Sequence, residues 1–346
     1  MKLCPDYLIL MLTDSCNLDC AYCYLGANKS CNTMSTGIID RALGLALESN
    51  RPFHVQLSGG EPTLVPEAVF HAAERVRRLS LSSTLGIQTN ATGIDRAMAD
   101  MMLKFNMDVG VSLDGPPRIQ ERLRGMARET FQGIKYLEER EIPFTVTTVV
   151  TRENLLHLDQ LALMLGGFTN ARGIGLDLLV KKGNVANAPL ASGPDSLVPD
   201  PHELKVGIRK MVTALNMVNR MRKIPIQLRE QNRLKSTLNG KGPTHFCRAA
   251  INKSLAVTPL GDLYPCTQTA FDPDFYWGNL ENPKFMNSRA SLAGLCVKEP
   301  SNIETCRICP LEDRCPGDCP GRIYYNGNTL LACAMYKGLF AQLNKE

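Results

Sequence analysis

Three cysteines near the amino end have a spacing that suits an iron–sulfur cluster. Cys16, Cys20 and Cys23 form the pattern C-x3-C-x2-C in a loop that follows a short apolar segment. A structural zinc site usually takes four ligands, often in C-x2-C pairs. Three thiolates can instead hold three irons of a [4Fe–4S] cube and leave the fourth iron open. The spacing therefore predicts a cluster with one free position for a substrate or a second cofactor.

A second set of cysteines lies in the last third of the chain. It comprises Cys247, then Cys266 with four residues between it and Gly261, then the run Cys306, Cys309, Cys315 and Cys319, and finally Cys333. Seven thiolates in a loop-rich segment fit either two iron–sulfur clusters or two zinc sites. Only Cys306 and Cys309 form the C-x2-C knuckle that zinc prefers, so the spacing favours iron–sulfur clusters.

Composition limits the remaining possibilities. The chain has 346 residues and 13 cysteines, an odd number that cannot pair fully in disulfides. A chain of this length does not need disulfides to fold, so we expect a reduced, cytoplasmic protein. The net charge is 39 − 34 = +5 without a run of basic residues, which supports neither nucleic-acid nor membrane-surface binding. No apolar stretch approaches the roughly 20 residues that span a bilayer.

Six strand-then-helix units precede the second cysteine set. The strands are expected at Leu8–Thr13, Val55–Leu57, Leu85–Thr89, Val109–Leu113, Phe144–Val150 and Ile174–Val180. The helices are expected at Thr36–Ser49, Pro66–Leu79, Ile94–Phe105, Glu129–Arg140, Leu155–Leu165 and His202–Arg222, with a polar loop at Asn184–Pro201. This alternation predicts a parallel sheet, as an open Rossmann-like sheet or an incomplete barrel. Either arrangement places ligands at the carboxyl ends of the strands.

The character of the sequence changes after about Gly240. Helical periodicity is lost, and glycine, proline, asparagine and cysteine become frequent. Such a segment has little apolar material for a core, and bound metal could supply the missing folding energy. We therefore predict a boundary near residues 235–243, with one domain at 1–238 and another at 239–346.

The first cysteine loop and two further motifs resemble those of radical S-adenosylmethionine (SAM) enzymes. The segment from Cys16 to Cys23, with Tyr22 before the last cysteine, is similar to their C-x3-C-x-aromatic-C signature. Gly59-Gly60-Glu61-Pro62 is similar to their GGEP motif, and Ser112-Leu113-Asp114-Gly115 with Arg124 matches the peptide-modifying branch. The resemblance extends from Leu8 to about Val180 and implies a partial (β/α)6 TIM-like barrel.

The same resemblance implies roles for individual residues. The open iron of the first cluster would bind the amino and carboxylate groups of SAM. The SAM-binding residues would be Tyr22 near the adenine, Gly59, Gly60 and Glu61 at the amino group, and Ser112 and Arg124 at the carboxylate and ribose. Reduction by the cluster would cleave SAM to a 5′-deoxyadenosyl radical, which abstracts a hydrogen atom from the substrate.

The carboxy-terminal cysteines resemble the SPASM domain, an extension of many radical SAM maturases. The match covers about residues 245–335 and implies two auxiliary [4Fe–4S] clusters, which makes three with the SAM-binding one. The first auxiliary cluster would use Cys247, Cys266 and Cys319, and the second Cys306, Cys309, Cys315 and Cys333. The last cysteine of a run also ligates the other cluster in two-cluster ferredoxins.

Two positions depart from the sulfatase-maturating members of that family. Lys253 stands where some relatives have a fourth ligand to the first auxiliary cluster, so this cluster is expected to have an open iron unless Cys296 fills the place. Thr267 stands where sulfatase maturases have an aspartate that serves as a base. Cys4, Cys31 and Cys296 belong to no motif and are interpreted as ordinary reduced cysteines.

The sequence therefore predicts an oxidoreductase that modifies a peptide or protein. The expected reaction forms a thioether or carbon–carbon crosslink in a ribosomally made peptide, with electrons from a flavodoxin- or ferredoxin-type partner. Because the cysteine loop begins at residue 16, we expect that a separate protein recognises any leader or that the substrate is recognised through its core. The alternatives are sulfatase-type protein oxidation, a reaction on a small molecule such as a tetrapyrrole, and a non-catalytic iron–sulfur electron carrier.

Overall fold

Strands and helices alternate along most of the chain. The structure, a computed structural model, describes residues 5–26, 30–48, 50–79, 83–187, 196–242, 245–281, 292 and 306–343. The strands are β1 (Tyr7–Met11), β2 (His54–Ser58), β3 (Thr84–Thr89), β4 (Asp108–Ser112), β5 (Phe144–Val150), β6 (Ala171–Leu178), β7 (Gln227–Leu228), β8 (Ser254–Val257) and β9 (Leu263–Tyr264). The helices are α1 (Thr36–Leu47), α2 (Pro66–Leu79), α3 (Arg96–Lys104), α4 (Pro117–Leu123), α5 (Ala127–Glu139), α6 (Leu158–Leu165), α7 (Asn184–Asn187), α8 (Pro201–Arg220), α9 (Arg229–Leu238), α11 (Pro320–Asn326) and α12 (Leu330–Leu343).

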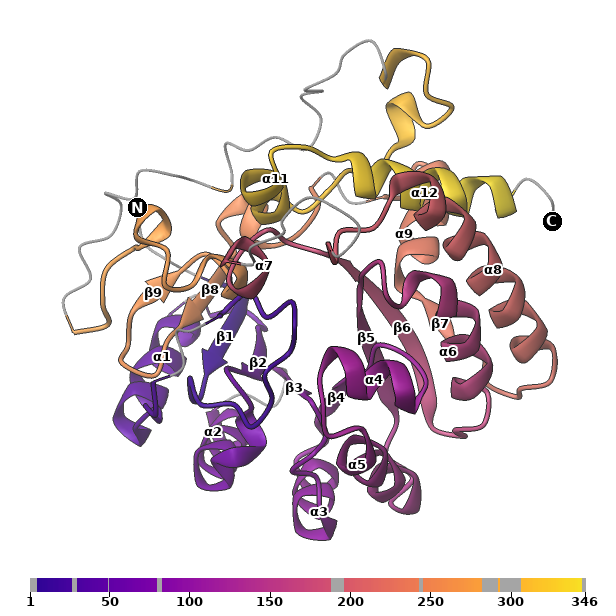
Figure 1. Cartoon of the computed structure of the whole chain (residues 1–346). Coiled ribbons are helices and arrows are strands. Elements are labelled where there is room, and N and C mark those ends of the chain that lie inside the picture. Colours follow the sequence, from indigo (N-terminus) through magenta and orange to yellow (C-terminus); the bar gives the residue numbers. More distant parts are fainter. Residues whose placement is uncertain are drawn as a thin grey trace.

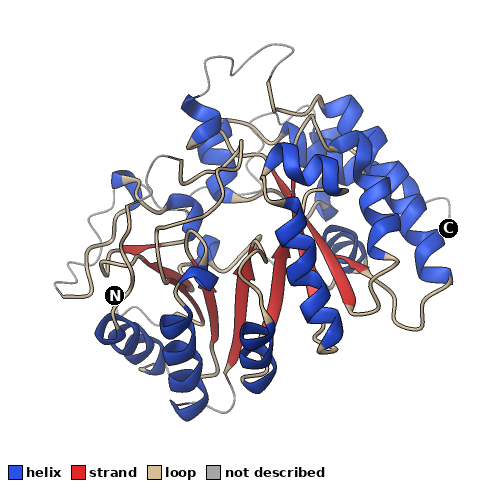
Figure 2. Ribbon diagram, turned by 60° about the horizontal axis from the view of Figure 1, so that its bottom comes forward, coloured by secondary structure: helices blue, strands red, loops and turns tan. Residues whose placement is uncertain are grey.

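The strands form one curved sheet in the order β7-β6-β5-β4-β3-β2-β1-β8-β9. Neighbouring strands from β7 to β8 pair in parallel, and only β8 and β9 pair antiparallel. Figure 1 shows β1 and β6 on opposite sides of the arc, and Figure 2 shows the helices outside the strands. The six strands β1–β6 therefore make the predicted partial barrel, and the open Rossmann-like alternative is excluded.

The two faces of the sheet differ in polarity because side chains alternate along each strand. On the helix side lie fully buried apolar residues such as Leu8, Val55 and Ile87. On the concave side, Gln88 donates from Nε2 to Oγ of Ser112 at 3.0 Å, and Tyr7 donates to Gln56 at 3.4 Å. The core therefore lies between sheet and helices, and the concave face is left polar.

Five of the six predicted helices and all six predicted strands agree with the structure to within about two or three residues. In the remaining predicted helix, Leu155–Leu165, the first turn is a 3-10 helix at Leu155–His157 and α6 follows it. The polar loop after β6 begins with the short helix α7, and residues 188–195 of it lie outside the described part.

The expectation that helical structure ends near Gly240 is wrong. Helix α12 spans Leu330–Leu343 and packs against α8, where the Cα of Gly338 comes so close that an added Cβ would lie 3.2 Å from the carbonyl oxygen of Lys205. In addition, β8 extends the barrel sheet by pairing with β1 from Tyr7↔Ser254 to Leu10↔Val257. The predicted domain boundary at residue 238 stays a prediction. The segment beyond it supplies two strands, β8 and β9, to the barrel sheet.

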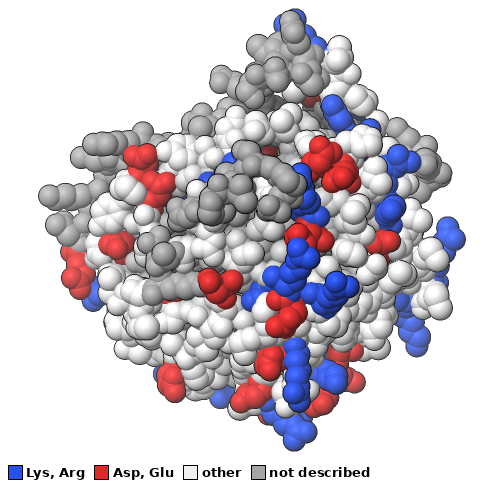
Figure 3. Space-filling view, in the orientation of Figure 1, with Lys and Arg blue, Asp and Glu red and all other residues white. Residues whose placement is uncertain are grey.

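Charged side chains are mixed on the molecular surface. On the face seen in Figure 3, lysines and arginines alternate with aspartates and glutamates, and white, uncharged areas separate them. In the part of the chain that the structure describes, no helix combines the length and the apolar character that crossing a bilayer requires.

Candidate active site

A cavity of about 390 Å³ opens at the carboxyl ends of the barrel strands. Its lining includes all nine residues predicted for the first cluster and for SAM: Cys16, Cys20, Tyr22, Cys23, Gly59, Gly60, Glu61, Ser112 and Arg124. They come from the loops that follow β1 and β2, from Ser112 at the end of β4 and from Arg124 at the end of α4. The parallel strands thus bring together motifs that are about a hundred residues apart in the sequence.

The cysteine loop after β1 is fastened to the Gly59-Gly60 turn after β2. The amides of Gly60 and Glu61 donate to the carbonyls of Thr13 and Ser15 at 2.7 and 2.8 Å. Gly59 has φ +139°, and an added Cβ there would lie 2.3 Å from the Thr13 oxygen. A Cβ on Gly60 would lie 2.0 Å from the Ser15 oxygen. Both glycines are therefore needed for the contact between the two loops, whereas the sequence analysis assigned them to an approach of SAM.

Glu61 is more deeply engaged with the protein than its predicted role requires. Its carboxylate is buried and accepts four hydrogen bonds, from the amide and hydroxyl of Thr63, the hydroxyl of Thr89 and the amide of Asn90, at 2.6–3.1 Å. Burial raises the pKa of this carboxyl, and the four hydrogen bonds oppose the shift. A carboxylate has about four acceptor positions. Protein donors therefore occupy this carboxylate, and the contact of Glu61 with SAM stays a prediction.

Asp114 is a residue of the site that the sequence analysis missed. Its carboxylate accepts the Tyr22 hydroxyl, two guanidinium nitrogens of Arg124 at 2.8 and 3.2 Å, and the Val149 amide at 3.0 Å. The Arg124 guanidinium also lies 5.2 Å from the centre of the Tyr22 ring. Burial, with a smaller contribution from Asp114, raises the pKa of Tyr22 well above its ordinary value. The pair of hydrogen bonds from the Arg124 guanidinium, which we expected on SAM, is made to Asp114.

The thiols of the first cysteine trio interact with one another. The pKa of Cys20 is raised to about 11 by burial, and by the nearby Cys23, Asp114 and Cys16, while Arg124 lowers it. Within the described part of the chain, no three His, Cys, Asp or Glu side chains stand close enough to share one metal ion. Thiolates around a [4Fe–4S] cube each bind a different iron and stand further apart. The three thiols line the cavity together.

A family comparison agrees with this geometry. The model of the radical SAM superfamily matches residues 10–165, which contain the cysteine trio, the GGEP motif and Asp114. Residues 10–165 are a radical SAM domain. Membership implies SAM and a [4Fe–4S] cluster as cofactors.

Curated relatives of this radical SAM enzyme carry several activities. The uncharacterized protein MJ0907 of Methanocaldococcus jannaschii is 27% identical over 75% of this chain and 84% of its own length. A cysteine-type anaerobic sulfatase-maturating enzyme of Clostridium novyi is 28% identical over 44% of this chain and 46% of its own. A pre-heme d1 synthase of Dinoroseobacter shibae is 31% identical over 44% and 39%.

Solved structures resemble the radical SAM enzyme along nearly its whole length. anSMEcpe with bound AdoMet has a TM-score of 0.78 at 21% identity and covers 97% of this chain and 92% of its own. Streptococcus suis SuiB bound to the precursor peptide SuiA has a TM-score of 0.65 at 16% identity, with coverage of 93% and 73%. The likeness shows a shared fold.

The carboxy-terminal thiols of the enzyme form two interacting groups. The pKa of Cys319 is raised to about 12 by burial and by Cys266 and Cys247, against the lowering effect of Arg322. The pKa of Cys315 is raised to about 11 by burial and, less, by Cys333, Cys309 and Cys306. The two groups have the same membership as the two predicted ligand sets.

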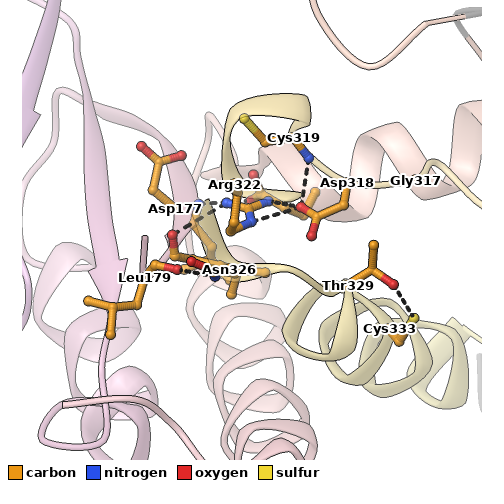
Figure 4. A network of polar contacts seen from close by, with 12 residues as sticks. Asp177, Leu179, Gly317, Asp318, Cys319, Arg322, Asn326, Thr329 and Cys333 are labelled. Carbon is orange, nitrogen blue, oxygen red and sulfur yellow. Dashed lines mark hydrogen bonds and ion pairs between the residues drawn. The ribbon is translucent and has the colours of Figure 1, made fainter. Parts of the chain in front are cut away.

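A buried ion pair lies beside Cys319 of the first group. Arg322 on α11 pairs with Asp318, and both side chains are almost inaccessible to solvent. Figure 4 shows Cys319 at the start of α11, Cys333 beside Thr329 on α12, and Asp318 between them in this view. Arg322 also donates to the carbonyl of Leu178 at 3.4 Å, so the pair connects the cysteine segment to the end of β6.

The remaining predicted positions have ordinary surroundings or lie outside the description. Cys31 is exposed, and Cys4 and Cys296 are outside the described residues. Lys253 precedes β8, and its carbonyl accepts the amides of Asp6 and Tyr7 at 3.1 Å. Thr267 follows Cys266 and lines the cavity together with Gln268. The position that carries aspartate in sulfatase maturases is therefore part of the active-site wall.

Proposed function

We propose that this radical SAM enzyme matures a ribosomally made peptide or protein by hydrogen abstraction followed by a thioether or carbon–carbon crosslink. The observation that carries the proposal is the composition of the cavity wall. Its SAM side is built by the predicted cofactor motifs, and the rest of its wall includes Asp177, Arg229, Thr267 and Gln268 from β6, α9 and the cysteine segment. A substrate side chain that enters this space lies next to the predicted SAM site.

The residues of the chain divide the work at the predicted cofactor site. When bound, the cluster and SAM supply reductive SAM cleavage and hydrogen abstraction. Cys16, Cys20 and Cys23 would hold the cluster. Asp114 fixes the guanidinium of Arg124 over the ring of Tyr22, so both side chains stand ready before SAM arrives. Ser112, held by Gln88, supplies a further hydroxyl.

We further propose two auxiliary [4Fe–4S] clusters, one on Cys247, Cys266 and Cys319 and one on Cys306, Cys309, Cys315 and Cys333. Support comes from the thiols that surround Cys319 and Cys315 and raise the pKa of these two residues. The raised pKa values leave Cys319 and Cys315 protonated in the metal-free chain near neutral pH, and iron binding would release these protons. Electrons would come from a flavodoxin- or ferredoxin-type protein.

The relatives support a peptide or protein substrate. Solved structures that share the fold hold an 18Cys peptide in anSMEcpe and the precursor peptide SuiA in SuiB. A separate protein that recognises a leader remains part of the proposal.

The test begins with the full chain reconstituted anaerobically. Three cubes predict about 12 iron atoms per chain. Under dithionite, the protein should form 5′-deoxyadenosine, and the triple variant C16A/C20A/C23A should not. A panel of peptides that contain cysteine or serine is then screened by mass spectrometry for a crosslink. Absence of 5′-deoxyadenosine from the fully loaded wild type would overturn the proposal.

Sulfatase-type oxidation is the second candidate, and the relatives that carry that name support it equally. It predicts that a cysteine or serine in a peptide loses two hydrogen atoms without forming a new link. Thr267 in place of aspartate weighs against the same proton acceptor, although not against the reaction. A tetrapyrrole substrate, suggested by the pre-heme d1 synthase match, predicts conversion of a porphyrin and of no peptide.

A further inference from the structure

Among the described residues, three carboxylates line the cavity, and two of them have a protein donor on both oxygens. Glu61 accepts its four hydrogen bonds from Thr63, Thr89 and Asn90. Asp14 is buried and accepts the hydroxyl of Ser30 and the amide and side-chain nitrogens of Asn32, each at 2.8 Å. These two groups fasten loops.

Asp177 is the third carboxylate, and its situation differs. It lies at the end of β6 on the concave face, and 43% of its side chain is exposed. One oxygen, Oδ1, accepts a nitrogen of Arg229 at 2.8 Å. In Figure 4 the carboxylate points away from Arg322 and Asp318. The second oxygen is therefore available to a molecule in the cavity.

Arg229 holds Asp177 in place from the first turn of α9. The guanidinium lies over Gly175 of β6, where an added Cβ would be 2.8 Å from its Cζ. It also donates to Glu230 at 2.6 Å and to the carbonyl of Leu176 at 3.0 Å. With its donors directed at three protein atoms, on Glu230, Leu176 and Asp177, Arg229 is a fixed support for Asp177.

The other titratable side chains of the cavity are poor proton acceptors. Burial raises the pKa of the phenols of Tyr7, Tyr22 and Tyr24, so these stay protonated. No histidine is among the described residues that line the cavity. Arg124 and Arg229 are charged donors.

We propose that Asp177 is the catalytic proton acceptor for a thiol or hydroxyl group of the peptide substrate. This inference rests on the proposed function. In the step, the S–H or O–H bond of the substrate breaks, its electron pair stays on the sulfur or oxygen, and the proton forms an O–H bond on Asp177. The step moves one proton and no electron. Abstraction of a hydrogen atom from a carbon of the peptide is a separate event.

The experiment compares three variants of the reconstituted full chain on the peptide that the wild type converts fastest. D177N keeps an oxygen for Arg229 and cannot take up a proton. We expect its product formation to fall at least about 100-fold, whereas 5′-deoxyadenosine formation stays within about twofold. D177E should recover part of the rate. D100N is the matched control, since Asp100 on α3 is exposed and pairs with Arg140 at 2.7 Å.

A pH profile separates proton transfer from a structural role. The wild type should lose kcat/KM at low pH as its carboxylate is protonated, and D177N should lack that limb. The charged and titratable groups around Asp177 are Arg229 and Glu230 of α9, Arg322 of α11 and Tyr24 of the cysteine loop. These groups are unchanged in D177N, so the limb that disappears belongs to Asp177.

The outcomes distinguish the two proposals. If the wild type forms product and D177N does so at a similar rate, Asp177 is not the acceptor and the proposed function stands. If the wild type cleaves SAM but converts no peptide, both proposals fall. If D177N loses SAM cleavage together with product formation, and D177E with wild-type iron content loses both as well, Asp177 has a structural role and is not the proton acceptor.

Discussion

The two sides of the active-site cavity are built in opposite ways. On the SAM side, the carboxylates of Asp14, Glu61 and Asp114 are buried, and protein donors occupy their oxygens. On the other side, the Arg229–Asp177 pair has side chains that are 47% and 43% exposed. A cofactor that is the same in each turnover suits a rigid, preorganised wall, whereas a peptide that must enter and leave suits an open one.

The largest expected effect comes from the contact between the cysteine loop and the GGEP turn. In G60A the new methyl group would lie 2.0 Å from the Ser15 oxygen, so the loop must move. We expect 5′-deoxyadenosine formation to fall by at least about 100-fold, because misplacement of about 1 Å has costs of this size. G44A is the control, since Gly44 of α1 has nothing within 4 Å. An active G60A protein would contradict the rigid SAM side.

The next effect tests the buried carboxylate of Asp114. D114A leaves the charge of Arg124, whose side chain is 9% exposed, without a partner. We expect the unfolding free energy in urea to fall by about 3–5 kcal/mol, and SAM affinity to fall with it. Removal of one partner from the exposed Arg140–Asp100 pair should cost less than about 1 kcal/mol. Equal losses at both places would remove the distinction between buried and exposed pairs.

Lys182 gives the open side a pH dependence. Its ammonium donates to the carbonyls of Gln268 and Ala270 at 2.7 and 2.8 Å, and burial lowers its pKa from 10.5 to about 8. The folded chain therefore binds fewer protons than the unfolded chain between about pH 8 and 10.5, so its stability rises with pH in that window.

The measurement is the difference in unfolding free energy between wild type and K182M in the metal-free chain. From pH 7.5 to 10.5, the unfolding free energy of the wild type should rise by about 2–3 kcal/mol relative to that of K182M. The variant of its neighbour, K181M, should show no such shift, since Lys181 is exposed. A flat difference for K182M would mean that Lys182 is as well solvated as Lys181.

The smallest effect compares one chemical change on both sides. Y22F removes a buried hydroxyl that donates to Asp114, and we expect a loss of about 1.5–3 kcal/mol. Y324F removes an exposed hydroxyl that donates to Asp274 at 2.9 Å, and the loss should be below about 0.5 kcal/mol. Thermal melting of both variants, beside the wild type, is sufficient to rank them.

The sequence predicted the barrel because its strands and amphipathic helices have clear periods. It did not predict α12, since the apolar residues of Leu330–Leu343 lie on most faces of that helix and leave no helical period. It also did not predict β8, because four residues carry little signal and its partner β1 is distant in the chain.

In the site, residue types were predicted better than their contacts. All nine predicted SAM and cluster residues line one cavity, but Glu61 and Arg124 direct their charged groups at protein atoms. These partners depend on loops that fold against each other, which no local pattern encodes. Asp114 lay within a motif that the sequence analysis quoted. Asp177 could have been found from the period-two pattern of the strand predicted at Ile174–Val180.

The pairing of β8 with β1 has a consequence for synthesis. The amide and carbonyl groups on one edge of β1 find their partners only when the ribosome has made Ser254–Val257. Until then the nascent barrel presents an open edge to other chains, a state prone to wrong strand pairing. Chains truncated before residue 254 should therefore aggregate in cells, although every residue of the SAM side is already present.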